Sequence, residues 1–247
     1  MFYVTGDIHG AAYELFERLR NMDLKEGDVI MCVGDVGLKY GSHVAGQLRA
    51  LMSAQPATFL VMRGNHDARY VRDWWAGRYL GTKYLREKDW CGMRVVFDER
   101  DPNILYLPDE GGAFERNGRR CLVVPGAFSV DGDYRRRNGR PFEPEEQLTC
   151  EELANLAALA AEAPVDYVFS HTCPRAWEDD VSYLFLDFLD QSGIDKRMED
   201  ALDGILETVR PSLRCWFFGH FHDDNDIIAG GLGHMVWFGT EAVPELA

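Results

Sequence analysis

The sequence predicts an α/β protein with two β-sheets and helices on the outside. Near the N-terminus, three short apolar runs are each followed by a Gly-polar turn, a pattern typical of βαβ units with a parallel sheet. Further along, Asn117-Gly118 between short apolar segments indicates an antiparallel hairpin. The 247 residues are enough to bury a full core in a large sandwich, and we expect residues 1–247 to form a single domain.

The first part of the chain repeats strand, turn and helix. Three strands are predicted: Phe2–Val4, Val29–Val33 and Thr58–Met62. Apolar side chains recur at helical spacing from Tyr13 to Met22, and a second helical stretch is predicted over 44–52. In the middle, three short segments are predicted to be antiparallel strands of a second sheet: Ile104–Leu107, Ala113–Glu115 and Arg120–Val124.

After a polar segment, the rest of the chain again alternates between predicted helices and predicted strands. From Ser129 to Pro144, glycine, proline and arginine predict an exposed loop. Two helices are then predicted, Glu145–Ala163 and Met198–Val209. Each precedes a predicted core strand, Tyr167–Phe169 and Cys215–Phe218. A closing hairpin is predicted from Ile227 to Phe238, with Gly230-Gly231 at its turn.

The composition of the chain argues against several classes of function. The net charge of −15 repels nucleic acid at long range and argues against long nucleic acid partners, although a bound cation inverts the local field for a phosphate. The six cysteines are scattered without a CxxC pair. No apolar run approaches the ~20 residues that span a bilayer, and the N-terminus does not resemble a signal peptide. We therefore expect a cytoplasmic protein without a membrane partner; the oligomeric state is not predicted.

Metal-binding residue types directly follow five of the predicted strands. They are Asp7 and His9, Asp35, Asn65 and His66, His171, and His220 and His222. In an open α/β sheet the loops at the carboxyl ends of strands converge, so we expect five distant segments to meet on one edge. Residues i and i+2 of an extended segment point to the same side, so Asp-x-His and His-x-His each direct two side chains to one site.

These donors suit hydrolysis at two metal ions. Carboxylate, imidazole and amide oxygen together favour Mn²⁺, Fe²⁺ or Zn²⁺ over Ca²⁺. A central carboxylate bridges two ions about 3.5–4 Å apart, and a bridging water loses a proton near neutral pH. We expect the resulting hydroxide to attack the phosphorus of a phosphate mono- or diester in line, while the ions offset the charge of the transition state.

Five motifs in chain order resemble those of the calcineurin-like metallophosphoesterase family. They are Gly6-Asp7-Ile8-His9-Gly10, Gly34-Asp35, Gly64-Asn65-His66-Asp67, His171 and Gly219-His220-Phe221-His222. The resemblance implies a four-layer α/β/β/α sandwich of two mixed sheets. It also implies a first metal bound by Asp7, His9 and His222, with Asp35 bridging both ions. The implied remaining ligands of the second metal are Asn65, His171 and His220, and His66 resembles the histidine that acts on the leaving-group oxygen.

The second motif departs from the serine/threonine protein phosphatase branch of this family. That branch continues as GDxVDRG, whereas this chain has Leu38 and Lys39 in place of the second Asp and the Arg. Asp67 also stands where the branch carries Glu. We therefore do not expect a strict protein phosphatase. Lys39, or an arginine from 135–137, is a candidate to bind phosphate instead.

Each candidate alone has a structural explanation. Asp7, Asp35 and Asn65 suit helix N-caps, and a single loop histidine is unremarkable, but five motifs at five strand ends argue against coincidence. The other conspicuous residues are better explained by packing or solvation: His43, His234, Trp74-Trp75, Trp177, Cys173 and the arginines 135–137.

Two alternative functions share this fold. A non-catalytic metal-binding scaffold would be indicated by loss of a ligand or of His66, and none is missing. A nuclease or nucleotide phosphodiesterase is the other; the net charge argues against long nucleic acids but not against nucleotides or short oligonucleotides. The favoured interpretation is a binuclear metallophosphoesterase acting on a phosphate-ester substrate.

Overall fold

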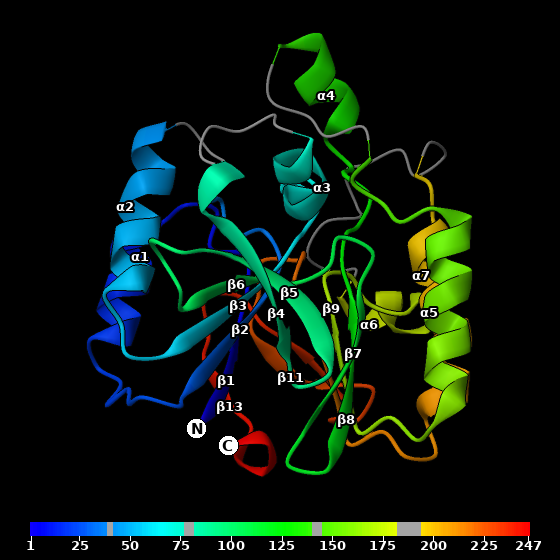
Figure 1. Cartoon of the computed structure of the whole chain (residues 1–247). Helices are drawn as coiled ribbons and strands as arrows, with labels where there is room; N and C mark the ends of the chain where they lie inside the picture. The colour runs from blue at the N-terminus through cyan, green and yellow to red at the C-terminus, as the bar shows by residue number, and fades with distance from the viewer. Residues whose placement is uncertain (39–41, 77–81, 140–144, 182–193) are drawn as a thin grey trace.

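A computed structural model describes residues 1–38, 42–76, 82–139, 145–181 and 194–247. Two β-sheets pack face to face, and helices cover both outer faces (Figure 1). Helices α1 (Ala12–Leu19) and α2 (Ser42–Ser53) lie on one side, and α5 (Cys150–Glu162) and α7 (Arg197–Val209) lie on the other. The predicted four-layer α/β/β/α sandwich is confirmed.

In the described part of the chain, the first sheet has seven strands in the order β13-β1-β2-β3-β6-β5-β4. Their bounds are β1 Phe2–Thr5, β2 Val29–Val33, β3 Thr58–Met62, β4 Leu85–Trp90, β5 Met93–Asp98, β6 Ile104–Tyr106 and β13 Glu241–Ala242. The strands β1, β2, β3 and β6 are parallel neighbours. The remaining pairs are antiparallel, so the sheet is mixed.

The second sheet, within the same described ranges, has six strands in the order β11-β12-β10-β9-β8-β7. Their bounds are β7 Gly112–Arg116, β8 Arg119–Val124, β9 Tyr167–Ser170, β10 Cys215–Phe218, β11 Asn225–Ile228 and β12 Gly233–Met235. Each of the two edge strands is antiparallel to its neighbour, and the inner pairs of strands are parallel. Asn117 and Gly118 form the predicted turn between β7 and β8, with φ of 52° and 71°.

Successive side chains of a strand point to opposite faces of its sheet, and the apolar ones form three layers. In β2, Val29, Met31 and Val33 belong to the layer between the sheets. Ile30 and Cys32 of the same strand instead pack with residues of α1 and α2. This period of two is the geometry of a strand that is covered on both faces.

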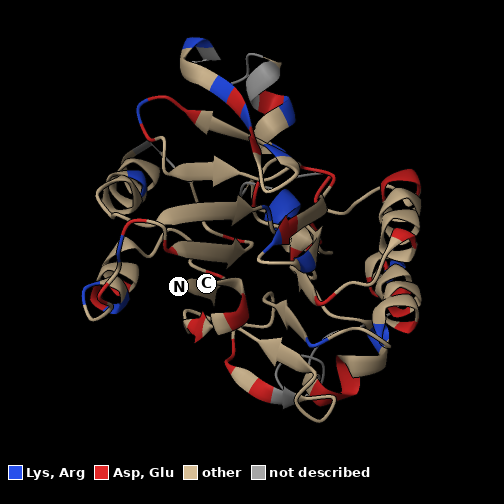
Figure 2. Cartoon of the chain, turned by 60° about the horizontal axis from the view of Figure 1, so that its bottom comes forward, with Lys and Arg blue, Asp and Glu red and all other residues tan. Residues whose placement is uncertain are grey.

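Aromatic rings fill much of the space between the sheets. Phe114, Phe169 and Phe217 stack in a row, with neighbouring ring centroids 6.2 and 5.6 Å apart. Figure 2 shows that charged residues lie mainly on helices and loops and seldom on the central strands. The inter-sheet layer is therefore dry and apolar, and it holds the two sheets in a fixed relation.

The prediction for the middle of the chain was partly wrong. Ile104–Tyr106 forms β6 of the first sheet, parallel to β3, and not a strand of the second sheet. The β4–β5 hairpin was not predicted, because the central residues of β4 are charged and exposed and so lack the apolar pattern of a buried strand. The two hairpin strands extend the first sheet beyond β6.

Two further boundaries differ from the prediction. The segment from Ser129 is not uniformly exposed: it contains α4 (Gly132–Arg137), and both Ser129 and Arg135 are buried, while 140–144 lie outside the described residues. The helix predicted from Glu145 begins at Cys150. Thr149 accepts a hydrogen bond from the backbone of Glu152 and completes a capping box there.

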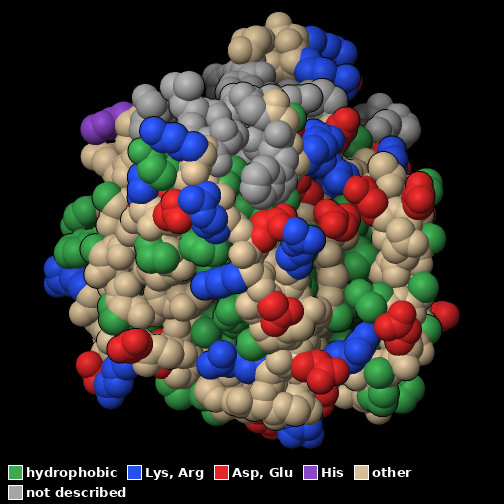
Figure 3. Space-filling model, in the orientation of Figure 1, with side chains coloured by type: hydrophobic (Ala, Val, Ile, Leu, Met, Phe, Trp, Pro, Cys, Tyr) green, Lys and Arg blue, Asp and Glu red, His purple; other side chains and the backbone are tan. Residues whose placement is uncertain are grey.

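The remaining described helices are short. They are α3 (Tyr70–Trp75), α6 (Glu178–Val181) and 3₁₀ turns at Thr82–Tyr84, Arg175–Trp177 and Pro244–Leu246. Within the described ranges, no helix combines the length and the apolar character that crossing a membrane requires. On the face shown in Figure 3, acidic and basic side chains are interspersed over the surface.

The structural explanations of several conspicuous residues are confirmed. Trp177 is buried against Trp216, with ring centroids 5.5 Å apart. Cys173 is buried, and burial raises the pKa of its thiol well above the usual value. His43 is exposed, and His234 packs on Phe217. The side chains of Trp74 and Trp75 lie outside the described residues.

Candidate metal centre

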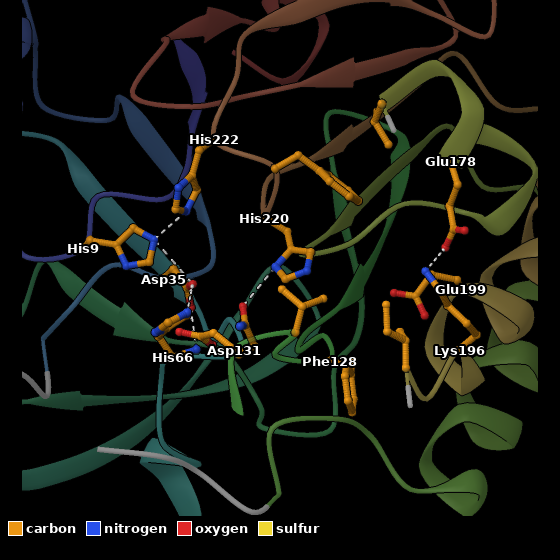
Figure 4. A pocket seen from close by; sticks show the side chains of 15 residues that line it. His9, Asp35, His66, Phe128, Asp131, Glu178, Lys196, Glu199, His220 and His222 are labelled. Atoms are coloured by element: carbon orange, nitrogen blue, oxygen red, sulfur yellow. Dashed lines mark hydrogen bonds and ion pairs between the residues drawn. The ribbon is translucent and has the colours of Figure 1, made fainter. Parts of the chain in front are cut away.

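Five loops meet at one rim of the sandwich. They follow β1, β2 and β3 of the first sheet and β9 and β10 of the second. The structure brings together all eight residues predicted from the motifs: Asp7, His9, Asp35, Asn65, His66, His171, His220 and His222. Figure 4 shows Asp35 and the four histidines that it labels around a common space.

A first group of donors consists of Asp7, His9 and His222. The Nε2 atoms of the two histidines are 2.9 Å apart and lie 3.8 and 3.7 Å from Oδ1 of Asp7. Asp7 is buried, and its Oδ2 accepts a hydrogen bond from the backbone N–H of His220 at 2.7 Å. Among the described residues, Oδ1 of Asp7 has no hydrogen-bond partner. One carboxylate oxygen and two imidazole nitrogens thus face one point.

A second group consists of Asn65, His171 and His220. Oδ1 of Asn65 lies 2.8 Å from Nε2 of His171 and 3.1 Å from Nδ1 of His220. Asn65 donates its amide N–H to Oγ of Ser129 at 2.8 Å, so its oxygen faces the histidines. Nδ1 of His171 lies 2.8 Å from the carbonyl oxygen of Val33, which directs Nε2 towards the centre.

Asp35 lies between the two groups. Its Oδ2 is 3.6 Å from Nε2 of His9 and 3.5 Å from Nε2 of His171. Its Oδ1 accepts the backbone N–H of His66 at 2.8 Å, and the Nε2 atom of His66 is 4.0 Å from Oδ2. A single carboxylate oxygen is therefore within reach of both donor groups.

The burial of two neighbouring carboxylates demands positive charge. Burial raises the pKa of Asp7 to about 8, against the opposing charge of His171. Burial acts the same way on Asp35, but the charge and hydrogen bond of His171, together with the charges of His66 and His9, outweigh it and hold the pKa of Asp35 well below its usual range. Burial disfavours protonated His171, yet the charge of Asp35 raises its pKa to about 9. Without metal, the site therefore retains protons that bound cations would displace.

His220 and His222 are suited to bind metal as neutral rings. Burial, reinforced by the charge of His9, lowers the pKa of His222 to about 4. Burial also lowers the pKa of His220 well below its ordinary value. Neutral imidazole is the form that ligates metal. Together with Oδ1 of Asp7, which faces His9 and His222, these donors fit divalent ions of the Mn²⁺, Fe²⁺ or Zn²⁺ kind.

The backbone at the centre is strained. Five of the candidate ligands have positive φ angles between 47° and 76°: Asp7, His9, Asp35, His220 and His222. Such conformations cost about 1–3 kcal/mol each for residues other than glycine and concentrate at functional sites. The prediction that Asp-x-His and His-x-His are extended segments was therefore wrong. Left-handed turns, and not strand alternation, direct these side chain pairs to the site.

Two glycines allow the loops to approach. A Cβ atom on Gly64 would lie 2.1 Å from Oδ1 of Asp35 and 2.6 Å from Nε2 of His171. Gly34 has a φ of 100°, and a Cβ atom there would lie 2.3 Å from Nδ1 of His171. Both positions therefore require glycine for this close approach of the backbone.

Asp67 ties the β2 and β3 loops together, a role that the sequence did not reveal. Its carboxylate accepts the backbone N–H groups of Val36 at 3.3 Å and Gly64 at 3.0 Å, and the hydroxyl of Tyr70 at 2.7 Å. Leu38, at the position of the second Asp of the protein phosphatase branch, is a buried core residue. Lys39 lies outside the described residues.

Two mixed sheets that bring Asp, Asn and His side chains to one rim define the metallophosphoesterase class of fold. Residues 1–224 match the sequence model of the calcineurin-like phosphoesterase family, and the chain belongs to this family. No curated protein matched the chain. Among solved structures, a protein of unknown function from Aquifex aeolicus aligns at 13% identity with a TM-score of 0.42, covering 94% of this chain and 82% of that chain.

Replacing Gly64 with alanine tests the tight packing of the centre. The added Cβ would collide with Asp35 and His171, so we expect Mn²⁺ binding to weaken about tenfold or more while the circular dichroism spectrum is retained. Calorimetric titration with Mn²⁺ measures the effect. The control is Gly204→Ala in α7, where a Cβ atom meets nothing within 4 Å. Unchanged affinity in folded Gly64→Ala protein would contradict the described geometry.

Proposed function

We propose that the chain is a binuclear, metal-dependent phosphoesterase that hydrolyses phosphate mono- or diesters. One observation carries the proposal: Oδ2 of Asp35 lies 3.6 Å from Nε2 of His9 and 3.5 Å from Nε2 of His171, between two groups of donors. Family membership supports phosphoester hydrolysis as the class of reaction. The first donor group would hold one ion and the second group the other, with Asp35 in contact with both.

The residues of the chain would hold and orient the groups around these ions. When bound, two divalent ions supply Lewis-acid stabilisation of the phosphoryl oxygens and a water acidified to near neutral pKa. The backbone N–H of His66 and the Nδ1 contact of His171 fix the orientations of Asp35 and His171. This hydrogen bonding holds the ligand atoms in place before a substrate arrives.

His66 is the proposed acid for the leaving group. Its ring is partly exposed in the cavity, edge-on to His9 with ring centroids 5.1 Å apart. It is thus beside the candidate ligands yet open to a substrate. We assign it the donation of a proton to the leaving-group oxygen.

Arg135 is the proposed contact for the substrate phosphate. Its side chain is 9% exposed, against 59% for Arg136 and 81% for Arg137. Within the described ranges its Nη1 makes no hydrogen bond, and it lies 3.7 Å from the carboxylate of Asp131, which lines the cavity with His66. A buried guanidinium with a spare donor is suited to phosphate.

We also propose that residues 1–247 act as one domain. The strand β13, late in the chain, pairs with β1, with Tyr3 opposite Ala242. The candidate ligands come from loops of both sheets, so neither sheet alone carries the site.

Metal reconstitution tests the function directly. Protein stripped with a chelator should not hydrolyse aryl phosphate mono- or diesters, and Mn²⁺ should restore turnover with about two ions bound per chain. Asp35→Asn should remain folded and lose activity, because this carboxylate lies between the two donor groups and would serve both ions. Full activity in Asp35→Asn would refute the proposal. Folded wild-type protein that binds metal without turnover would instead support the scaffold alternative.

His66→Ala separates proton donation from metal binding. We expect both ions to stay bound while kcat falls about 10²–10⁴-fold for an alkyl phosphate, with a smaller loss for 4-nitrophenyl phosphate, whose leaving group needs no proton. Steady-state kinetics on both esters measure the difference, with exposed His43→Ala as the control. An equal loss on both esters would remove His66 from proton transfer.

Arg135→Gln tests the phosphate contact against a neighbour on the same helix. Loss of a charge-assisted hydrogen bond should lower kcat/KM for an aryl phosphate about ten- to a hundredfold. Arg136→Gln, whose side chain is exposed, should stay within about twofold of the wild type. Equal effects of the two substitutions would show that α4 contributes only general positive charge.

A further inference from the structure

A cavity of about 440 Å³ opens beside the candidate metal centre. His9, His66 and His222 form one side of it, and Glu178, Lys196 and Glu199 lie on the opposite side (Figure 4). Cavities of about 300–1,000 Å³ hold organic ligands, so this volume exceeds the need of a phosphate group alone. The cavity therefore has room for the organic part of a phosphate ester.

Apolar side chains form much of the cavity wall. They are Phe128, Val130, Val181, Ile194 and Phe221. Phe128 and Phe221 come from different parts of the chain, after β8 and after β10, and both are only partly buried by the protein itself. Partly exposed aromatic side chains beside a cavity favour a flat ring, because stacking on an aromatic side chain is worth about 1–3 kcal/mol for a nucleobase.

Glu199 provides an unused acceptor at the far side. Its side chain on α7 is 5% exposed, and Oε1 accepts the hydroxyl of Thr172 at 3.0 Å. Among the described residues, Oε2 has no hydrogen-bond partner. A buried carboxylate oxygen without a donor is destabilising, so an N–H group of a ligand in the cavity would satisfy it.

Lys196 places a donor near this acceptor. Its Nζ lies 2.7 Å from Oε1 of Glu178, and Figure 4 shows this ion pair beside Glu199. An ammonium at this position would repel a cationic amine in the cavity. A purely apolar group would pack against the apolar wall of the cavity but would leave Oε2 of Glu199 without a hydrogen-bond donor.

We propose that this cavity binds the organic group of the substrate, and that this group is a flat heteroaromatic ring with an N–H donor beside an acceptor, as in a nucleobase. Glu199 is then the specificity-determining residue and accepts the N–H of the base, while Phe128 and Phe221 contact its faces. The substrate class becomes nucleoside phosphates. The identification of a substrate rests on the proposed function, but the binding of the base does not.

The first experiment measures binding of the four common ribonucleosides, which lack phosphate, to the wild-type protein by calorimetry. We expect saturable binding of at least one nucleoside. Glu199→Gln should weaken it about tenfold or more, because a charged acceptor is lost. Glu207→Gln, an exposed residue of the same helix, is the matched control and should bind as the wild type does. Phe128→Leu, which removes an aromatic face without touching α7, should also weaken binding.

Kinetics then distinguish the two proposals. The wild type should have a higher kcat/KM for the 5′-monophosphate of the bound nucleoside than for phenyl phosphate, and Glu199→Gln should reduce the former by a larger factor than the latter. Nucleoside binding without hydrolysis of either ester would uphold the cavity assignment and refute the phosphoesterase. Hydrolysis of phenyl phosphate, with no nucleoside bound and no preference for nucleotides, would overturn the cavity assignment and leave the phosphoesterase intact.

Discussion

The contact between the two sheets is the interaction on which the rest of the molecule depends. Three of the ligand loops belong to the first sheet and two to the second, so the site exists only while the sheets keep their relative position. Hydrogen bonds cross this boundary at the rim, and two examples involve a backbone group. Nδ1 of His171 lies 2.8 Å from the carbonyl oxygen of Val33, and the backbone N–H of His220 donates to Asp7 at 2.7 Å. The apolar layer behind them fixes the distances at which these bonds form.

Features that oppose folding lie together at the rim that carries the candidate metal ligands. Asp7 and Asp35 are buried beside each other, and five candidate ligands have left-handed backbone conformations. Both costs are localised where the loops converge, while the strands beneath are regular and covered on both faces. A stable sandwich thus tolerates a strained and highly charged edge, the usual division between scaffold and functional site. Bound cations would offset the charge part of this cost.

Much of the fold could be predicted because its strands are apolar and its turns carry glycine. The buried strands β2, β3 and β10 have the predicted bounds, since continuous apolar runs end at polar motifs. The convergence of the eight motif residues was also predicted, because each follows a strand. In contrast, β4 carries charged side chains on an exposed edge, and its sequence does not differ from that of a polar loop.

Other features depend on tertiary contacts and leave no local signal. Glu199 is one acidic residue in an amphipathic helix, and only the packing of α7 on the second sheet buries it. Ser129 resembles any loop serine until the chain brings it to Asn65. Arg135 and Arg136 are adjacent and identical in type, yet the orientation of α4 buries one and exposes the other.

The order of the strands has a consequence for the timing of assembly. Asp7 and His9 are synthesised before their partner His222, which follows β10 and comes more than two hundred residues later. Asn65 is likewise synthesised before its partners His171 and His220. A growing chain therefore carries only fragments of either donor group, and N-terminal parts that begin to fold during translation lack the full ligand set of both groups. Binding of a cation by either complete donor group would then require the docking of the second sheet.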